Sequence, residues 1–129
     1  MKNVFFFLLS FVTFQLVGQP SNNNPKEAFA KMTFAATTVD YGIIYKGSEP
    51  TRTFNFQNTG NAPLLITDAK ASCGCTVPTF PKDAIMPGEL SAITVRYDTN
   101  RIGVISKSIT ITSNAGEPVV LKITGEVKS

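Results

Sequence analysis

Short runs of alternating apolar and polar residues, separated by glycine, proline and asparagine, fill the sequence from Lys31 onward. A period of two with many β-branched and aromatic residues predicts half-buried β-strands, and no window keeps a helical period for three turns. The alternating positions are Met32 and Phe34, Val39, Tyr41 and Ile43, Phe54 and Phe56, Leu64 and Ile66, Ile93, Val95 and Tyr97, Ile109 and Ile111, and Val119, Leu121 and Ile123.

This pattern corresponds to about seven strands in roughly 100 residues, which predicts an all-β fold, an immunoglobulin-like antiparallel β-sandwich. The two sheets of a sandwich would bury the alternating residues between them. Turns are expected at residues 58–61, 86–89 and 114–116, where Asn, Pro and Gly cluster. A small barrel is the alternative that alternation alone leaves open.

The apolar alternation of Leu64 and Ile66 does not continue into the residues that follow. Continuing the same phase would turn Asp68 and Lys70 inward, so we expect a bulge near residues 67–68. Beyond the bulge, the expected inward set is Ala69, Ala71, Cys73, Cys75 and Val77. Both thiols would then point to one face.

Residues 1–18 are typical of a secretory signal peptide. Lys2 is the only charge before Lys26, and residues 4–17 are almost wholly apolar. This apolar run is roughly 14 residues long, whereas a membrane-spanning helix needs about 20. We therefore predict an exported protein, periplasmic or secreted, that is cleaved after Gly18. An uncleaved N-terminal anchor is the alternative.

The rest of the chain is predicted to be a linker followed by one domain. Residues 19–30 contain Pro, Ser and Asn and almost no apolar residue, which predicts a flexible linker, and residues 31–129 carry the sandwich. Loss of residues 1–18 leaves 111 of 129 residues, enough for one modest core. It also leaves 11 basic and 9 acidic residues, a net charge of +2. The basic residues are scattered, which excludes the clustered face that nucleic acid binding needs.

The sequence contains no His and no Trp. The absence of His excludes Ser-His-Asp catalysis, Cys-His nucleophile pairs and imidazole metal sites. Asp68, Asp83, Glu89 and Asp98 each stand alone at a turn or strand end, so nothing indicates a paired-carboxylate site. We predict that the protein is not an enzyme and that it has no catalytic residue and no cofactor.

The most unusual chemical feature is the motif Cys73-Gly74-Cys75-Thr76. Residues two apart in a strand have Cα atoms about 6.6 Å apart, whereas a disulfide prefers about 5.5–6 Å. A bridge therefore needs a bend, which Gly74 can supply through φ values closed to other residues. So short a loop gains roughly 1.6 kcal/mol of stability from the bridge. Added stability is therefore a poor explanation of this spacing.

Four interpretations of the cysteine pair stay open. One is a local disulfide that rigidifies a bend, and another is a pair of reduced, partly buried thiols that act as small apolar residues. A third is a redox-active pair, with Lys70 and Lys82 stabilising a thiolate if they fold close by. The fourth is a soft-metal site, because two thiolates can hold Cu(I) although a tetrahedral zinc site would lack two ligands.

Six short motifs form a specific combination between about Thr33 and Val127. They are residues 39–44 (VDYGII), 54–60 (FNFQNTG), 64–66 (LLI), 72–78 (SCGCTVP), 87–89 (PGE) and 113–115 (SNA). Together they resemble the bacterial domain-of-unknown-function family 1573. The resemblance implies a short exported protein with an immunoglobulin-like fold, similar to Hydin-type domains, and it implies no established activity. Family members often carry Phe where Tyr41 stands, a change that a strand core tolerates if the hydroxyl finds a partner.

We therefore expect a non-enzymatic binding or structural module of the cell envelope. An unpaired edge strand would accept an extended peptide or an envelope protein. The alternative is an exported thiol-redox or Cu(I)-handling protein centred on Cys73 and Cys75. No nucleic acid partner and no membrane span after signal removal are expected.

One mass measurement tests the signal peptide and the thiol pair together. Protein recovered from the periplasm without reductant, and alkylated under denaturing conditions, is expected to start at Gln19, and it carries no alkyl group if Cys73 and Cys75 form a bridge. Alkylation of both Cys73 and Cys75 would contradict the bridge. A mass that still includes residues 1–18 would contradict cleavage.

Overall fold

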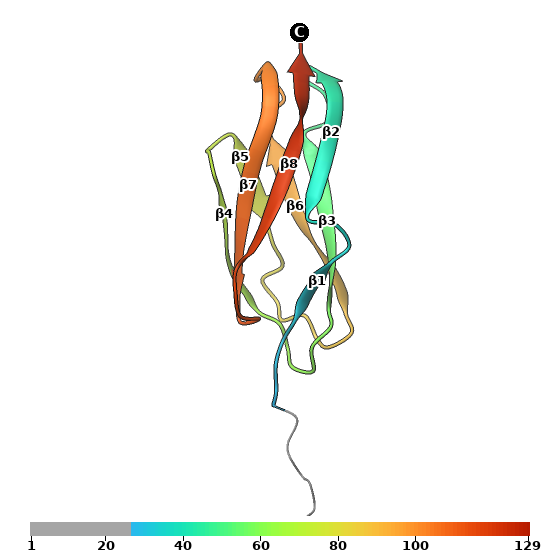
Figure 1. Cartoon of the computed structure of the whole chain (residues 1–129), viewed down its shortest axis with the longest axis vertical. Coiled ribbons are helices and arrows are strands. Elements are labelled where there is room, and N and C mark those ends of the chain that lie inside the picture. The colour runs from blue at the N-terminus through green and yellow to red at the C-terminus, as the bar shows by residue number, and fades with distance from the viewer. Residues whose placement is uncertain (1–26) are drawn as a thin grey trace, which may run out of the picture.

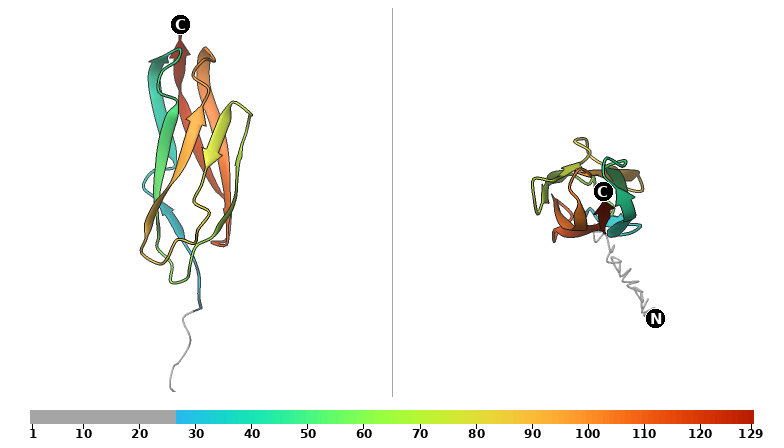
Figure 2. Two further views of the ribbon diagram at one scale, coloured as in Figure 1. Left: turned by 180° about the vertical axis from the view of Figure 1, so that it is seen from behind. Right: turned by 90° about the horizontal axis from the view of Figure 1, so that it is seen from above.

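The computed structural model describes residues 27–129, which form two four-stranded β-sheets packed face to face (Figure 1). The strands are β1 (Met32–Phe34), β2 (Thr38–Tyr45), β3 (Thr51–Asn58), β4 (Ile66–Ala71), β5 (Thr76–Thr79), β6 (Leu90–Tyr97), β7 (Gly103–Ser113) and β8 (Val119–Lys128). One sheet has the order β1-β3-β6-β5 and the other β2-β8-β7-β4. Figure 2 shows the two layers from behind and from above. The predicted all-β sandwich is confirmed, and the barrel alternative is wrong.

Two features of the topology differ from the prediction. β2 pairs with β8 in parallel, whereas the other paired strands run antiparallel. The chain also changes sheets between β4 and β5, within a stretch that the sequence pattern treats as one continuous run. The described residues therefore contain eight strands rather than about seven. The predicted signal peptide, residues 1–18, lies outside the described residues.

The core lies between the sheets and consists mainly of the residues at the predicted alternating positions. Burying one such large apolar side chain contributes about 1.5–3 kcal/mol to the free energy of unfolding. No buried side-chain nitrogen or oxygen in residues 27–129 lacks a hydrogen-bond partner. The largest side chains with under 2 % exposure are Phe54, Phe56, Leu64, Ile93, Ile105, Ile109, Ile111, Leu121, Ile123, Val95, Val127 and Asn58.

Two irregularities in strand register reset the alternation. The one between Ile66 and Asp68 lies where a bulge is predicted. The prediction misses the other one, between Asp40 and Ile43, where Gly42 has a φ of 69°. Ile43 is predicted to point inward, and this is wrong because the bulge turns it outward, where it is 65 % exposed.

Gly42 and Gly125 face each other across the β2–β8 pair. Gly125 has a φ of 140°, and a Cβ built on it would lie 2.8 Å from the carbonyl oxygen of Gly42. A side chain at residue 125 would therefore be strained and would also collide with backbone. The bulge in β2 depends on this close approach.

The last residues of the predicted linker, residues 19–30, contact the domain. Phe29 N–H donates to Asn61 Oδ1 at 2.8 Å, and the Phe29 carbonyl accepts from Asn61 N–H at 2.8 Å and from Ala62 N–H at 3.0 Å. Ala30 is buried. Contacts with the domain are thus already present at Phe29, two residues before the predicted boundary, and residues 19–26 lie outside the described residues.

Asn58, at the end of β3, is completely buried, and all its amide positions are used. Its Oδ1 accepts from Gly60 N–H at 3.0 Å and from Lys31 N–H at 3.4 Å. Its Nδ2 donates to the carbonyls of Ala62 and Ile85, both at 2.8 Å. One side chain therefore connects the entry to β1, the end of β3, the turn at residues 58–61 and the segment before β6.

The turn at residues 58–61 also packs directly on the chain that leads into β1. A Cβ built on Gly60 would lie 2.3 Å from Phe29 O and 2.7 Å from Lys31 N. Only a residue without a side chain permits this approach. The Asn-Thr-Gly sequence is thus used for packing as well as for turning.

Replacing Asn58 with Ala should strongly destabilise the protein. The change leaves the N–H groups of Lys31 and Gly60 and the carbonyl of Ala62 without the partner they have in the structure, at about 1–3 kcal/mol for each such group that is buried, whereas the Ile85 carbonyl keeps the Leu64 N–H as a donor. We expect the free energy of unfolding, measured by urea denaturation, to fall by about 3 kcal/mol or more. Asn55→Ala, an exposed position on the same strand, is the matched control and should change it by less than about 0.5 kcal/mol. Equal losses in the two variants would contradict the role of Asn58.

Candidate functional site

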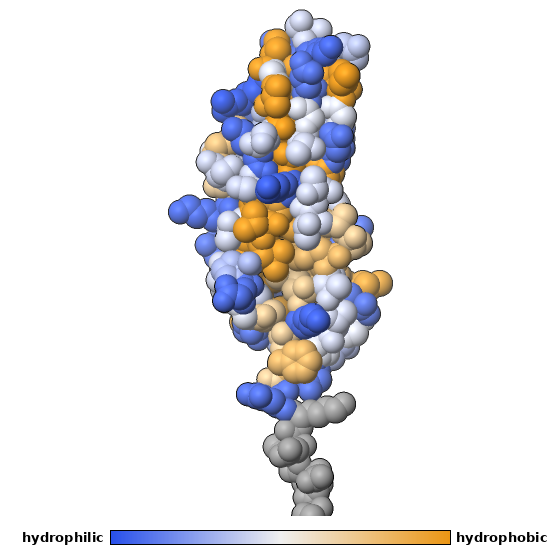
Figure 3. Space-filling model, in the orientation of Figure 1, coloured by the Kyte–Doolittle hydropathy of each residue, from blue (hydrophilic) through white to orange (hydrophobic). Residues whose placement is uncertain are grey.

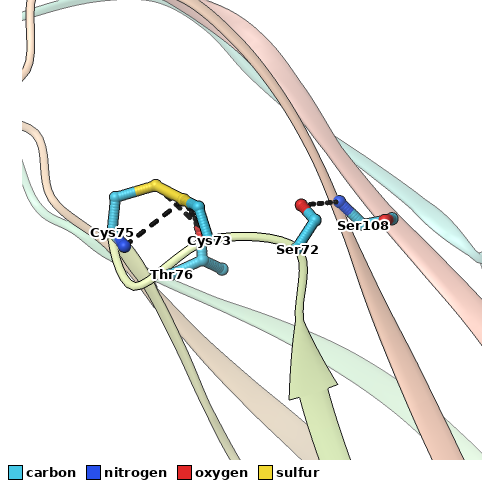
Figure 4. The surroundings of a disulfide bond; sticks show 5 residues. All are labelled: Ser72, Cys73, Cys75, Thr76 and Ser108. Atoms are coloured by element: carbon cyan, nitrogen blue, oxygen red, sulfur yellow. Dashed lines mark hydrogen bonds between the residues drawn. A yellow bond between two sulfur atoms is a disulfide. The ribbon is translucent and has the colours of Figure 1, made fainter.

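The cysteine motif lies in the turn that carries the chain from β4 in one sheet to β5 in the other. Ser72 N–H donates to the Ser108 carbonyl at 2.9 Å, and Ser72 Oγ accepts from Ser108 N–H at 3.2 Å (Figure 4). On the opposite side, Asp98 N–H donates to the Cys75 carbonyl at 2.9 Å. The turn is therefore attached to both sheets.

Cys73 and Cys75 form a disulfide whose Cα atoms are 5.3 Å apart. This separation is shorter than the roughly 6.6 Å of an extended strand, so the expected bend is present. The expected reason for Gly74 is wrong, because Gly74 is not among the glycines with positive φ, and a Cβ built there meets nothing within 4 Å. This geometry favours the disulfide over the pair of reduced thiols.

Three polar contacts surround the two sulfur atoms. Cys75 N–H donates to Cys73 Sγ at 3.3 Å. Thr76 Oγ1 lies 3.8 Å from Cys73 Sγ and 3.6 Å from Cys75 Sγ (Figure 4). Thr76 is only 3 % exposed, so its hydroxyl is held in place next to the bridge.

The predicted inward positions of this segment hold only in part, and Cys73 is not among the residues that pack against the core. Ala69, Ala71 and Cys75 pack against the core, but Val77 is 55 % exposed, and Thr76 occupies the buried position instead. The alternation restarts because the chain changes sheets at residues 72–75. The prediction that Val77 points inward is therefore wrong.

The two lysines considered as activating groups do not supply the polar contacts of the sulfurs. Lys82 Nζ lies 3.6 Å from the centre of the Phe80 ring, a cation–π arrangement. Lys70 is exposed on β4. In the described part of the chain, the hydrogen bonds to sulfur come from Cys75 N–H and the Thr76 hydroxyl.

A cleft of about 460 Å³ opens beside the disulfide. Its walls come from the β2–β3 turn, from the cysteine turn with the start of β5, and from the end of β6 with the loop after it. Cys75 and Gly74 line the cleft, and Cys73 does not. Arg96 and Asp98 place one charge of each sign on the wall.

Tyr41 supports the wall of this cleft through Pro50. The Pro50 carbonyl accepts from Tyr41 Oη at 2.7 Å and from Tyr97 N–H at 3.0 Å. Tyr41 is buried, and the Arg52 guanidinium lies 4.2 Å from the centre of its ring. Burial raises the pKa of the Tyr41 hydroxyl above its ordinary value of 10.0, and the charge of Arg52 partly opposes this rise.

The second candidate site is the free edge of β2. β2 ends its sheet and is eight residues long, whereas β1 has three residues. β5 has four residues and contains Pro78, which cannot donate a backbone hydrogen bond. β4 and β5 are edge strands of the two different sheets and contact each other, so each covers part of the other's open edge. Among the described strands, β2 therefore offers the longest open edge.

Four exposed apolar side chains lie on the outer face of this sheet near the end of β2, two on β2 itself and two at or just before the start of β7 on the other side of β8, and we call them the β2 patch. Ile43 and Val104 both pair with Glu126 of β8, so they flank it on the outer face of the sheet. Figure 3 views this face and shows hydrophobic side chains at the end nearest the C-terminus. The β2 patch consists of Ile43 at 65 %, Tyr45 at 63 %, Ile102 at 58 % and Val104 at 74 % exposure.

The β2 patch does not follow from the sequence pattern, because simple alternation assigns Ile43 to the core. Gly42 is the available signal, since a glycine inside a strand often marks a bulge. Within residues 27–129, no group of three or more His, Cys, Asp or Glu is arranged to hold a metal ion. No helix in that part of the chain has the length and apolar character needed to cross a membrane.

Comparison with known proteins gives one family and a common fold. A family model described as "Protein of unknown function (DUF1573)" matches residues 32–127. No curated protein sequence matches the chain.

Three solved structures illustrate the similarity of fold. A protein of unknown function from Porphyromonas gingivalis W83 has a TM-score of 0.66 and 18 % identity, over 81 % of this chain and 51 % of that chain. PapD-like domain 7 of human CEP192 has a TM-score of 0.64 and 5 % identity, over 77 % and 86 %. The periplasmic chaperone SfaE has a TM-score of 0.58 and 10 % identity, over 76 % and 58 %. The chain spans about half the length of the P. gingivalis protein, and at these identities the likeness shows the fold alone.

Replacing Tyr41 with Phe tests the support of the cleft. The Pro50 carbonyl keeps the Tyr97 N–H as a donor, so we expect a loss of only about 1 kcal/mol in the free energy of unfolding near pH 7. Because the pKa of Tyr41 is raised in the folded state, the unfolded chain loses this proton first, and the stability due to Tyr41 falls as the pH rises above about 10.

The difference between the wild-type protein and Tyr41→Phe should therefore shrink in urea titrations carried out above that pH. Tyr45→Phe, an exposed position on the same strand, is the control for the loss of a tyrosine. A difference that grows with pH would contradict the burial of the neutral hydroxyl.

Proposed function

Because the chain belongs to the DUF1573 family, whose function is unknown, we propose a function from its surface and its fold. The protein is an exported, non-enzymatic immunoglobulin-like module that binds an extended segment of a cell-envelope protein along the free edge of β2. The observation that carries this proposal is the pair of exposed apolar side chains of the β2 patch, Ile43 and Tyr45, that stand on the strand with the longest open edge. The predicted signal peptide and the likeness in fold to a periplasmic chaperone support the location.

The strand edge supplies the directional part of binding. An edge strand presents backbone N–H and C=O groups that an added strand can pair with. Two N–H groups of β2 already have side-chain partners, since Gly42 N–H donates to Asp40 Oδ1 at 2.8 Å and Tyr45 N–H donates to Ser48 Oγ at 3.1 Å. These local bonds protect part of the edge, so a bound segment depends on the other groups and on side-chain contacts.

The β2 patch supplies the apolar part of binding. Ile43 and Tyr45 are two residues apart and therefore project from the same face of β2. Glu126 and Lys128, which pair with them on β8, place one charge of each sign between the apolar side chains. This arrangement fits a segment with apolar residues at alternate positions and little net charge. Each apolar side chain that becomes fully buried contributes about 1.5–3 kcal/mol.

The Cu(I) alternative has no observation in its favour and stays a prediction. The thiol-redox alternative concerns the disulfide in the turn between β4 and β5. It is independent of binding at β2.

Nuclear magnetic resonance titration tests the proposed binding. We expect peptides from a digest of cell-envelope proteins to shift the amide signals of ¹⁵N-labelled protein along β2. The double variant Ile43→Lys with Tyr45→Lys should abolish these shifts, because it places two charges on the strand that forms the edge. Leu90→Lys, at a position that is 78 % exposed on the other sheet, should retain them. Shifts that are absent, or that are confined to β4 and β5, would overturn the proposal.

A further inference from the structure

The disulfide between Cys73 and Cys75 has two sulfur atoms in unequal surroundings. We infer that it is a thiol–disulfide exchange site in which the cysteine thiolate of a peptide attacks Cys75 Sγ and Cys73 leaves as the thiolate. This goes beyond the proposed binding at β2, which requires no chemistry at sulfur.

Access favours attack at Cys75. Cys75 lines the cleft of about 460 Å³, whereas Cys73 is not among the residues of its wall. Gly74 is exposed, and the space where its Cβ would stand is empty to 4 Å. A peptide thiolate can therefore approach the bridge from the cleft without displacing a side chain at residue 74.

Hydrogen bonding favours departure of Cys73. Its Sγ has two potential donors, Cys75 N–H at 3.3 Å and the Thr76 hydroxyl at 3.8 Å. Cys75 Sγ has the Thr76 hydroxyl alone, at 3.6 Å. Hydrogen bonds to an ionised acceptor are roughly twice as strong as neutral ones, so these donors stabilise negative charge better on Cys73. Thr76 acts here as a positioning residue, because its buried hydroxyl lies close to both sulfur atoms.

The cleft itself carries no single sign of charge. Arg96 would attract an incoming thiolate, and Asp98 would repel it. Asp98 Oδ1 already accepts from Asn100 N–H at 3.1 Å. The choice between the two sulfurs therefore comes from access and from the N–H and hydroxyl donors rather than from the charged side chains.

The exchange balances without an outside oxidant. In the first step the bond between the two Sγ atoms breaks, a bond forms between the peptide sulfur and Cys75 Sγ, and the electron pair leaves with Cys73. If the peptide carries a second thiol, its thiolate attacks the peptide sulfur of the mixed disulfide and expels the Cys75 thiolate. The two peptide cysteines are then oxidised to a disulfide, Cys73 and Cys75 are reduced, and the two peptide protons end on Cys73 and Cys75.

The test uses the purified oxidised protein and a tripeptide that contains one cysteine. After brief reaction, acid quenching and alkylation, fragment mass spectrometry locates the tripeptide and the alkyl group. We expect the tripeptide on Cys75 and the alkyl group on Cys73, with the reverse product about tenfold rarer, because about 1.4 kcal/mol separates the two departing thiolates. The tripeptide on Cys73, or equal labelling of both, would overturn the assignment.

Variants of Thr76 test the role of the hydroxyl. Thr76→Val keeps the shape of the side chain and should slow mixed-disulfide formation about fivefold, the effect of one lost hydrogen bond. Thr76→Ser should retain the rate, and Thr79→Val, at an exposed position on the same strand, should leave it unchanged. If Thr76→Val does not fold, two results still test the proposal: the rate of mixed-disulfide formation in Thr76→Ser, and the cysteine that carries the tripeptide in the wild-type protein. Exchange no faster than in urea-unfolded protein would make the bridge a structural link.

Discussion

The buried amide of Asn58 is the interaction on which the arrangement of strands at one end of the sandwich depends. Its four hydrogen bonds hold the entry to β1, the turn after β3 and the segment that leads to β6. Without them, three backbone groups, the N–H groups of Lys31 and Gly60 and the Ala62 carbonyl, would lose their partners, at about 1–3 kcal/mol for each such group that is buried. The residue type at position 60, two residues after Asn58, is equally constrained. A side chain on Gly60 would collide with the backbone of the chain that leads into β1. The Asn-Thr-Gly sequence is therefore a packing element as much as a turn.

Much of the fold follows from alternation in the sequence, and the failures have identifiable causes. Phe54 and Phe56 are buried as their period of two predicts, and the register shift after Ile66 lies where two polar residues would otherwise point inward. Ile43 is wrongly assigned because a single glycine reverses the phase. Val77 is wrongly assigned because the chain changes sheets in the cysteine turn, which a one-dimensional pattern does not record. The cleft beside Cys75 brings together three segments distant in sequence, and no local signal predicts their meeting.

The two candidate sites share one structural element, the turn between β2 and β3. Ser48 bonds to Tyr45 at the end of β2, and its carbonyl accepts from the Thr99 hydroxyl at 2.8 Å. The same turn supplies Gly47, Ser48 and Pro50 to the cleft beside the disulfide. A segment bound along β2 would thus end next to the residues that form one wall of the cleft. The proposed binding at the strand edge and the proposed exchange at Cys75 are distinct, but both regions include residues of the β2–β3 turn.

The parallel pairing of β2 with β8 has a mechanical consequence. The described chain enters the sandwich at one end, and its C-terminus lies at the other (Figure 1). Tension applied between the two ends would pull β2 and β8 in opposite directions along their common axis. The hydrogen bonds between β2 and β8, from the pair Thr38 and Lys122 to the pair Tyr45 and Lys128, would then be loaded together in shear rather than opened one after another. A domain built in this way is suited to transmitting force between whatever is attached at its two ends.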